Sequence, residues 1–124
     1  MRAVLCGANG AMGKLIDGQL PQEVAGRVSL DGENGVARTF AQLGPVEADV
    51  VMDFSHHSAI SDVLAYAKGI GAAAVIGTTG HTEAEKAEIL AASQEIPVFY
   101  SGNMSLGIAV LCRLAQQAAA AFPD

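Results

Sequence analysis

A glycine-rich turn directly after the first apolar run constrains this fold more than any other stretch. Residues 3–6 (AVLC) read as a strand, and residues 7–13 (GANGAMG) have glycine at every third position. Such glycines permit a tight turn, close approach of an anion and close packing of the next helix. The N–H groups at the helix start attract negative charge. The turn therefore predicts a phosphate-binding loop, and a plain glycine-rich turn is the alternative because the Gly-x-x-Gly-x-x-Gly spacing is uncommon.

Composition limits the size of the fold and the class of partner. The 124 residues suffice for a single three-layer core but not for a second domain of similar size. A net charge of −6 with only seven Lys and Arg argues against nucleic acid or an anionic membrane as partner. No apolar run approaches the roughly 18 residues of a membrane span, and no signal sequence is evident. We therefore expect a cytoplasmic protein that binds small molecules.

The apolar pattern alternates between short strands and helices. The expected strands are residues 3–6, 28–30, 50–54, 72–76 and 97–100. The expected helices are residues 12–20, a short irregular one within 36–47, 58–69, one that starts with a Thr82/Glu85 capping box, and 106–121. This alternation predicts an α/β fold, a doubly wound parallel sheet of Rossmann type in one domain, with strand order 3-2-1-4-5.

Asp31 is the first candidate beyond the glycine turn. It follows the expected second strand and lies 18 residues after Gly13, near the spacing at which an acidic side chain binds the adenosine ribose of a dinucleotide. The alternative is a solvated turn aspartate. The nearest downstream arginine is Arg38, so no cation for a 2′-phosphate is evident, and this favours NAD over NADP.

Further candidates follow the third and fourth strands. Residues 77–80 (GTTG) offer a flexible backbone and two hydroxyl groups, either to a dinucleotide or simply as a turn. Asp53 is interpreted as holding the adjacent backbone, with catalysis as the alternative. His56 and His57 suggest a metal or catalytic site, but ligands at suitable spacing are missing, which favours a partly exposed pair in a loop.

Four segments together resemble a known family: residues 7–13, 49–55 (DVVMDFS), 75–80 (VIGTTG) and 103–107 (NMSLG). They resemble the amino-terminal half of 4-hydroxy-tetrahydrodipicolinate reductase, also called dihydrodipicolinate reductase. The resemblance covers nearly the whole chain. It implies an oxidoreductase that reduces a cyclic dicarboxylate with NADH or NADPH in the diaminopimelate route of lysine biosynthesis, and a parent enzyme that forms a homo-oligomer. Family members usually have Phe where Met104 stands, and often Asn where Ala109 stands.

The resemblance also assigns roles to residues. Residues 7–12 would bind the pyrophosphate, Asp31 the adenosine ribose, and the loops after the fourth and fifth strands the nicotinamide half. The expected cofactor-binding residues are Gly7, Ala8, Asn9, Gly10, Ala11, Met12, Asp31, Phe54, Ser55, Gly77, Thr78, Thr79, Ser101, Gly102, Asn103 and Met104. The family's catalytic His-His-x-x-Lys and Asp-Ala-Pro-Ser-Gly-Thr motifs do not occur here. Residues 1–124 are therefore expected to be a dinucleotide-binding domain that is inactive without a carboxy-terminal catalytic domain. A free-standing NAD(P)-binding or sensing module is the alternative.

Overall fold

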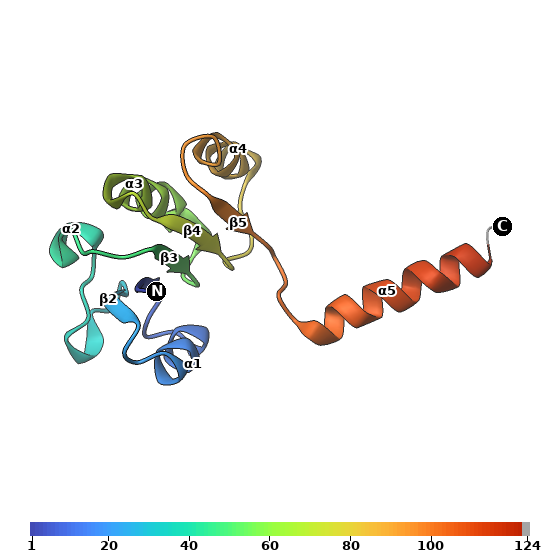
Figure 1. Ribbon diagram of the computed structural model, residues 1–124, viewed down its shortest axis with the longest axis horizontal. Helices are drawn as coiled ribbons and strands as arrows, with labels where there is room; N and C mark the ends of the chain where they lie inside the picture. Colours follow the sequence, from blue (N-terminus) through green and yellow to red (C-terminus); the bar gives the residue numbers. More distant parts are fainter. Residues whose placement is uncertain (123–124) are drawn as a thin grey trace.

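The computed structural model describes residues 1–122 and contains a five-stranded parallel sheet (Figure 1). The strands are β1 (Ala3–Cys6), β2 (Val24–Val28), β3 (Val50–Asp53), β4 (Ala73–Ile76) and β5 (Val98–Tyr100). The helices are α1 (Ala11–Gln19), α2 (Phe40–Leu43), α3 (Ile60–Ile70), α4 (Glu83–Ala92) and α5 (Leu106–Ala121). Short 3-10 turns occupy Glu33–Gly35 and His57–Ala59. The predicted α/β fold class is confirmed.

The strand order is β2-β1-β3-β4-β5, so the predicted order 3-2-1-4-5 is wrong. β3 pairs directly with β1 and with β4, in register from Val50 to Asp53. β3 is almost entirely buried, as suits a central strand, whereas β2 includes Arg27 and suits an edge. The order therefore reverses between β1 and β3. In open α/β sheets, ligands bind at such a reversal, beyond the carboxyl ends of the strands.

Several element boundaries differ from the expected ones. The second strand ends at Val28, where the sequence pattern placed its start, and the following Leu30 is largely exposed. Helix α3 continues past Gly69 to Ile70, and Gly71, with a positive φ of 70°, is its C-cap. The capping box of Thr82 and Glu85 at the start of α4 is confirmed.

Two apolar clusters pack on opposite faces of the sheet. One face is covered by α2, α3 and α4, and its cluster includes Val4, Val51, Ile60 and Ile76. The other face is covered by α1, around Leu5 and Val24. This second cover is incomplete. In the cross-strand row Leu5, Met52, Val75 and Phe99, exposure rises from 0% at Leu5 to 56% at Phe99.

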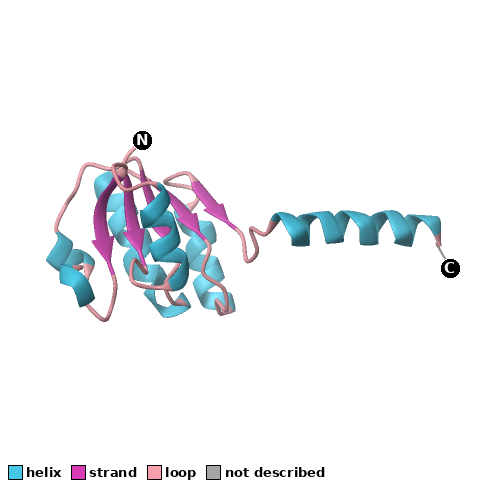
Figure 2. Ribbon diagram, turned by 90° about the horizontal axis from the view of Figure 1, so that it is seen from below, coloured by secondary structure: helices cyan, strands magenta, loops and turns pink. Residues whose placement is uncertain are grey.

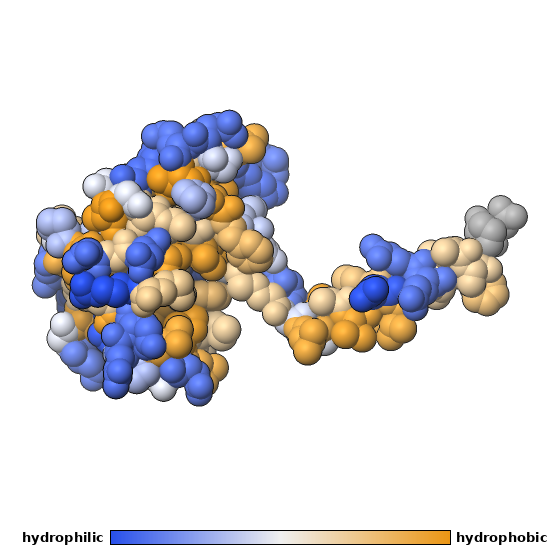
Figure 3. Space-filling view, viewed as in Figure 1, coloured by the Kyte–Doolittle hydropathy of each residue, from blue (hydrophilic) through white to orange (hydrophobic). Residues whose placement is uncertain are grey.

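Helix α5 extends away from the sheet (Figures 1 and 2). Its bounds match the prediction, and Ser105 caps its start through the N–H of Ile108. Its packing differs from that of the other long helices, since α5 has no buried residue. The apolar side chains of Val110, Leu111 and Leu114 are about half exposed or more, and apolar surface follows one side of α5 in Figure 3. The layered body therefore ends at β5.

Candidate functional site: a crevice at the carboxyl ends of the strands

The glycine turn lies where the strand order reverses, and two of its glycines are sterically required. Gly7 has φ +81°, and a Cβ there would collide with the Phe54 carbonyl group beyond β3. A Cβ on Gly13 would collide with the Gly7 carbonyl oxygen, so only glycine lets α1 pack this closely on the turn. Gly10 is the N-cap of α1, and no side chain caps that helix start. The free N–H groups there suit an anion.

A cavity of about 410 Å³ runs from this turn to the loop after β2. Six of the expected cofactor-binding residues line it: Gly7, Asn9, Gly10, Asp31, Phe54 and Ser55. Ala8 lies buried beneath the turn, whereas Ala11 and Met12 are exposed on the first turn of α1. The structure thus gathers the residues expected to bind the pyrophosphate and adenosine around one crevice.

Asp31 belongs to the exposed rim of this cavity. The Asn9 side chain donates a hydrogen bond to Asp31 Oδ1 at 2.5 Å, and the backbone N–H of Glu33 donates to the same oxygen at 3.1 Å. These two hydrogen bonds lower the pKa of the Asp31 carboxyl, that from Asn9 most strongly. The carboxylate therefore stays ionised at neutral pH, linked through Asn9 to the glycine turn.

Arg38 lies nearer to this rim than the sequence indicates. The Ser29 N–H donates to the Ala37 carbonyl at 2.8 Å, which folds the chain back beside Asp31. A Cβ on Gly32 would lie 2.6 Å from Arg38 Nε, and Arg38 lines the same cavity as Asp31. The expectation that no cation is evident beside Asp31 is therefore wrong. No sequence pattern predicts this reversal of the chain, because it is formed by a backbone hydrogen bond after β2, between Ser29 and Ala37.

Asp53 is a fully buried carboxylate that joins two loops. Its Oδ1 accepts from the N–H of Ser55 at 3.1 Å and from the Ser55 hydroxyl at 2.5 Å. Its Oδ2 accepts from the Thr78 hydroxyl at 2.9 Å, and Thr78 Oγ1 in turn accepts from the Ser55 N–H. The predicted structural role of Asp53 is thus confirmed, since it holds both loops that follow β3 and β4.

The residues expected around the nicotinamide lie at the β4 and β5 end of the same edge, outside this cavity. The Phe54 ring packs against the Gly77 backbone, where any Cβ would collide with it. Thr79 is exposed, and a Cβ on Gly102 would lie 3.9 Å from its methyl group, so the loops after β4 and β5 adjoin. Asn103 Oδ1 accepts from the Ser105 N–H at 2.8 Å, and Ser101 donates to the Asn103 carbonyl. Met104 is about half exposed.

A comparison with known families bears on this geometry. The family described as dihydrodipicolinate reductase, N-terminus, matches residues 1–104, which include the glycine turn and all five strands. The chain belongs to the dihydrodipicolinate reductase family. The strand ends that form the crevice are therefore those of this family's amino-terminal region.

Curated relatives agree with this membership. Three proteins named 4-hydroxy-tetrahydrodipicolinate reductase, from Campylobacter jejuni, Alkaliphilus oremlandii and Caldanaerobacter subterraneus, are each 40% identical to the chain. The alignments cover 90%, 100% and 96% of this chain but only 45%, 50% and 50% of those relatives. The chain thus spans about half the length of the curated relatives that it matches.

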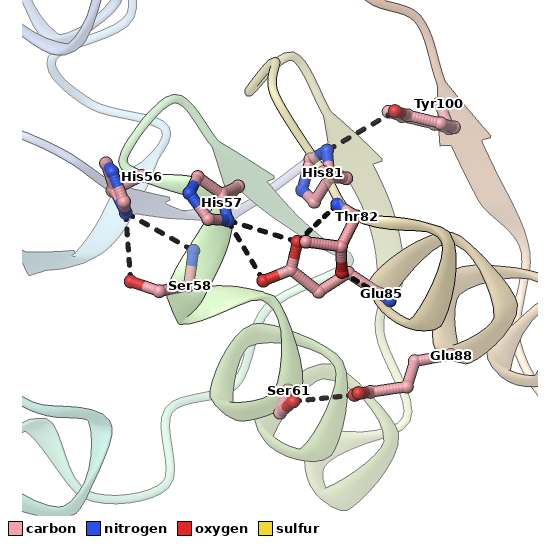
Figure 4. A network of polar contacts seen from close by, with 9 residues as sticks. All are labelled: His56, His57, Ser58, Ser61, His81, Thr82, Glu85, Glu88 and Tyr100. Atoms are coloured by element: carbon pink, nitrogen blue, oxygen red, sulfur yellow. Dashed lines mark hydrogen bonds and ion pairs between the residues drawn. The ribbon is translucent and has the colours of Figure 1, made fainter.

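Three histidines lie near the crevice of this family member (Figure 4). His56 is exposed and His57 is half-buried, as the interpretation as a loop pair expects. His57 Nδ1 lies 2.9 Å from Glu85 Oε1. This contact, followed by the Thr82 backbone N–H, lowers the Glu85 pKa to about 2. Sequence reasoning missed the third, His81, which is 6% exposed and has its Nδ1 3.3 Å from the Tyr100 hydroxyl. Across residues 1–122, no three His, Cys, Asp or Glu side chains could jointly hold a metal ion.

Among residues 1–122, no helix is both long and apolar enough to cross a lipid bilayer.

Proposed function

We propose that this chain is the dinucleotide-binding domain of a 4-hydroxy-tetrahydrodipicolinate reductase, which works in the cytoplasm on the diaminopimelate route to lysine. The observation that carries the proposal is the crevice itself, because Gly7 and Gly13 keep the start of α1 open beside a cavity that extends to Asp31. Family membership supports the reductase over a free-standing sensing module. A further domain would supply the substrate-binding and catalytic residues, which accords with relatives about twice as long.

The residues present fit a nicotinamide dinucleotide. The N–H groups at the start of α1 would bind the pyrophosphate, and the cavity beside Asn9 and Asp31 would hold the adenosine ribose. The adjoining loops at Thr79 and Gly102 would enclose the nicotinamide half. Bound NADH or NADPH would supply the hydride, and the chain's own residues orient the dinucleotide and keep water from one side of it.

We propose NADH as the preferred dinucleotide. Asp31 is ionised and offers its second carboxylate oxygen to a ribose hydroxyl, whereas a 2′-phosphate would meet that negative charge. Arg38 beside Gly32 would offset part of this repulsion, so NADPH should still bind, more weakly.

Calorimetric titration of the chain with NADH and NADPH tests the proposal. The purified chain should bind both, NADH more tightly, and should reduce no substrate by itself. A Gly10→Val variant tests the crevice directly, because Gly10 lines the cavity and its φ of −71° is open to any residue, while a Cβ there would lie 3.2 Å from the Gly7 carbonyl oxygen and require only a small shift of the turn. Its circular dichroism should match that of the unmodified chain while its NADH affinity falls. Absence of binding by the unmodified chain would count against the crevice assignment.

A further inference from the structure

His81 is buried but does not line the cavity beside the glycine turn. Its imidazole is 6% exposed and meets the Tyr100 ring edge to face, with ring centroids 5.3 Å apart at 88°. Its Nδ1 lies 3.3 Å from the Tyr100 hydroxyl (Figure 4). Its Nε2 is buried and has no hydrogen-bond partner within residues 1–122. A buried polar ring with one unpaired nitrogen is costly, which indicates that His81 serves a specific purpose.

The position of His81 along the chain suggests that purpose. Thr78 is 6% exposed and is fixed by Asp53, whereas Thr79 and Gly80 are exposed. His81 is the next buried residue, and Thr82 then begins α4 through its capping box. The exposed Thr79–Gly80 pair therefore lies between two buried residues, Thr78, which is bonded to Asp53 of β3, and His81, which contacts Tyr100 of β5.

The contact between His81 and Tyr100 also controls the distance between two loops. Tyr100 ends β5 and precedes Gly102 by two residues, and Gly102 adjoins the Thr79 methyl group. β5 itself is short and pairs with β4 only from Val98 to Tyr100. The His81–Tyr100 contact therefore adds a side-chain link between the loops at the point where the backbone ladder ends.

We propose that His81 and Tyr100 are positioning residues that set the spacing of the two loops around the nicotinamide half of the dinucleotide. This inference rests on the proposed function, which puts the nicotinamide between these loops. Neither residue needs to touch the dinucleotide. The proposed adenosine and pyrophosphate positions, beside β2 and β1 at the other end of the sheet, do not depend on this pair.

The test compares two ligands on the 124-residue chain. NADH contains the nicotinamide half, whereas ADP-ribose lacks the nicotinamide ring and keeps the adenosine and pyrophosphate. His81→Phe and Tyr100→Phe should each weaken NADH binding about three- to tenfold, the range expected for one neutral hydrogen bond that orients a loop. ADP-ribose affinity should stay within about twofold. The double variant should bind NADH no more weakly than the weaker single variant, because both changes remove one contact.

Two further variants sharpen the comparison. His81→Gln keeps a side-chain hydrogen-bonding group and should restore part of the NADH affinity lost in His81→Phe. Tyr66→Phe is the matched control, since the Tyr66 hydroxyl also donates one hydrogen bond, at 2.8 Å to the Gly44 carbonyl, and neither residue belongs to the loops after β4 and β5. That variant should leave the ratio of the two affinities unchanged.

Each contrary result has its own meaning. If the variants lose affinity for NADH and ADP-ribose equally, His81 has only a general structural role, and the inference is overturned. Unchanged NADH affinity in both variants would overturn it too, as would an unmodified chain that binds ADP-ribose as tightly as NADH. A chain that binds neither ligand overturns the proposed function, and the inference with it, before any variant is compared.

Discussion

At the scale of single residues, Asp31 and Arg38 place opposite charges on one rim of the crevice, and we expect them to favour different dinucleotides. Replacing Asp31 by Asn keeps the size of the side chain and removes the charge. NADH affinity should then fall by roughly tenfold, because a charged acceptor of ribose hydroxyl groups is lost. NADPH affinity should hold or rise as repulsion of its phosphate disappears. Titration calorimetry at fixed ionic strength measures both constants, since salt screens the phosphate interaction.

Arg38→Ala is the complementary variant to Asp31→Asn. It should weaken NADPH binding and leave NADH binding unchanged. Equal losses for both dinucleotides in the Asp31 variant would mean that Asp31 only shapes the turn.

A second prediction at this scale concerns Asp53. Asn in its place has only one carbonyl oxygen and must present its amide group to Ser55 or to Thr78. We expect Asp53→Asn to lower the free energy of unfolding by about 1–3 kcal/mol, the cost of a buried hydrogen bond left unmade. Urea unfolding measures it. Ser61→Ala, which removes an exposed hydroxyl bonded to Glu88, should change little, and equal effects of the two variants would contradict the central role of Asp53.

At the scale of elements, one carboxylate at the start of α4 joins that helix to the turn before α3. Glu85 accepts from the Thr82 N–H at 2.7 Å and meets His57, which lies in the turn before α3. The Glu85 pKa falls from its usual 4.5 to about 2 on folding, so the ionised carboxylate contributes to the free energy of unfolding. This contribution is fully present above pH 4.5 and is lost as the pH falls toward 2.

This pH dependence is open to measurement with Glu85→Gln. The variant should be less stable than the unmodified chain at pH 5 to 7, and the difference should vanish as pH approaches 2. Chemical unfolding at a series of pH values provides the comparison. A difference that is constant across that series would show that the carboxylate charge plays no part.

The element scale also shows what sequence reasoning can and cannot predict. The apolar run of β3 predicted a strand buried on both faces. The carboxylate of Asp53 predicted a cap on the adjacent backbone. Both features could be predicted because they depend on residues that are close in sequence. The strand order depends instead on where the chain crosses the sheet after β2. Right-handed crossovers permit both orders, so the apolar pattern alone does not decide between them. The predicted site residues at the ends of β1 and β3 nonetheless meet, because both orders align the carboxyl ends of the strands at one edge.

At the scale of the whole molecule, the compact body and α5 differ in how firmly they are held. All of α5 is exposed, and an isolated helix of about its length is only marginally stable in water. Limited trypsin digestion should therefore cut first after Arg113, the only basic residue of α5, and leave a stable fragment that contains all five strands. Mass spectrometry identifies the fragment.

The remaining basic residues provide the contrast for this digestion. Arg27, in β2, forms an ion pair with Asp17 of α1 and should resist cleavage. Arg113→Gln should delay the first cut. Early cleavage at Lys68 or Lys86, before Arg113, would show that α5 is better protected than its exposure indicates.

The incomplete cover over Met52, Val75 and Phe99, together with the exposed α5, has a calorimetric consequence. The heat capacity of unfolding reports apolar surface that becomes hydrated only when the chain unfolds. Here part of that surface already contacts water in the native state. Unfolding should thus show an increment nearer the about 1.2–1.5 kcal/mol/K typical of 100 residues than the about 1.5–1.9 kcal/mol/K expected for 124. The stability curve of the chain should accordingly be flatter with temperature than its length suggests.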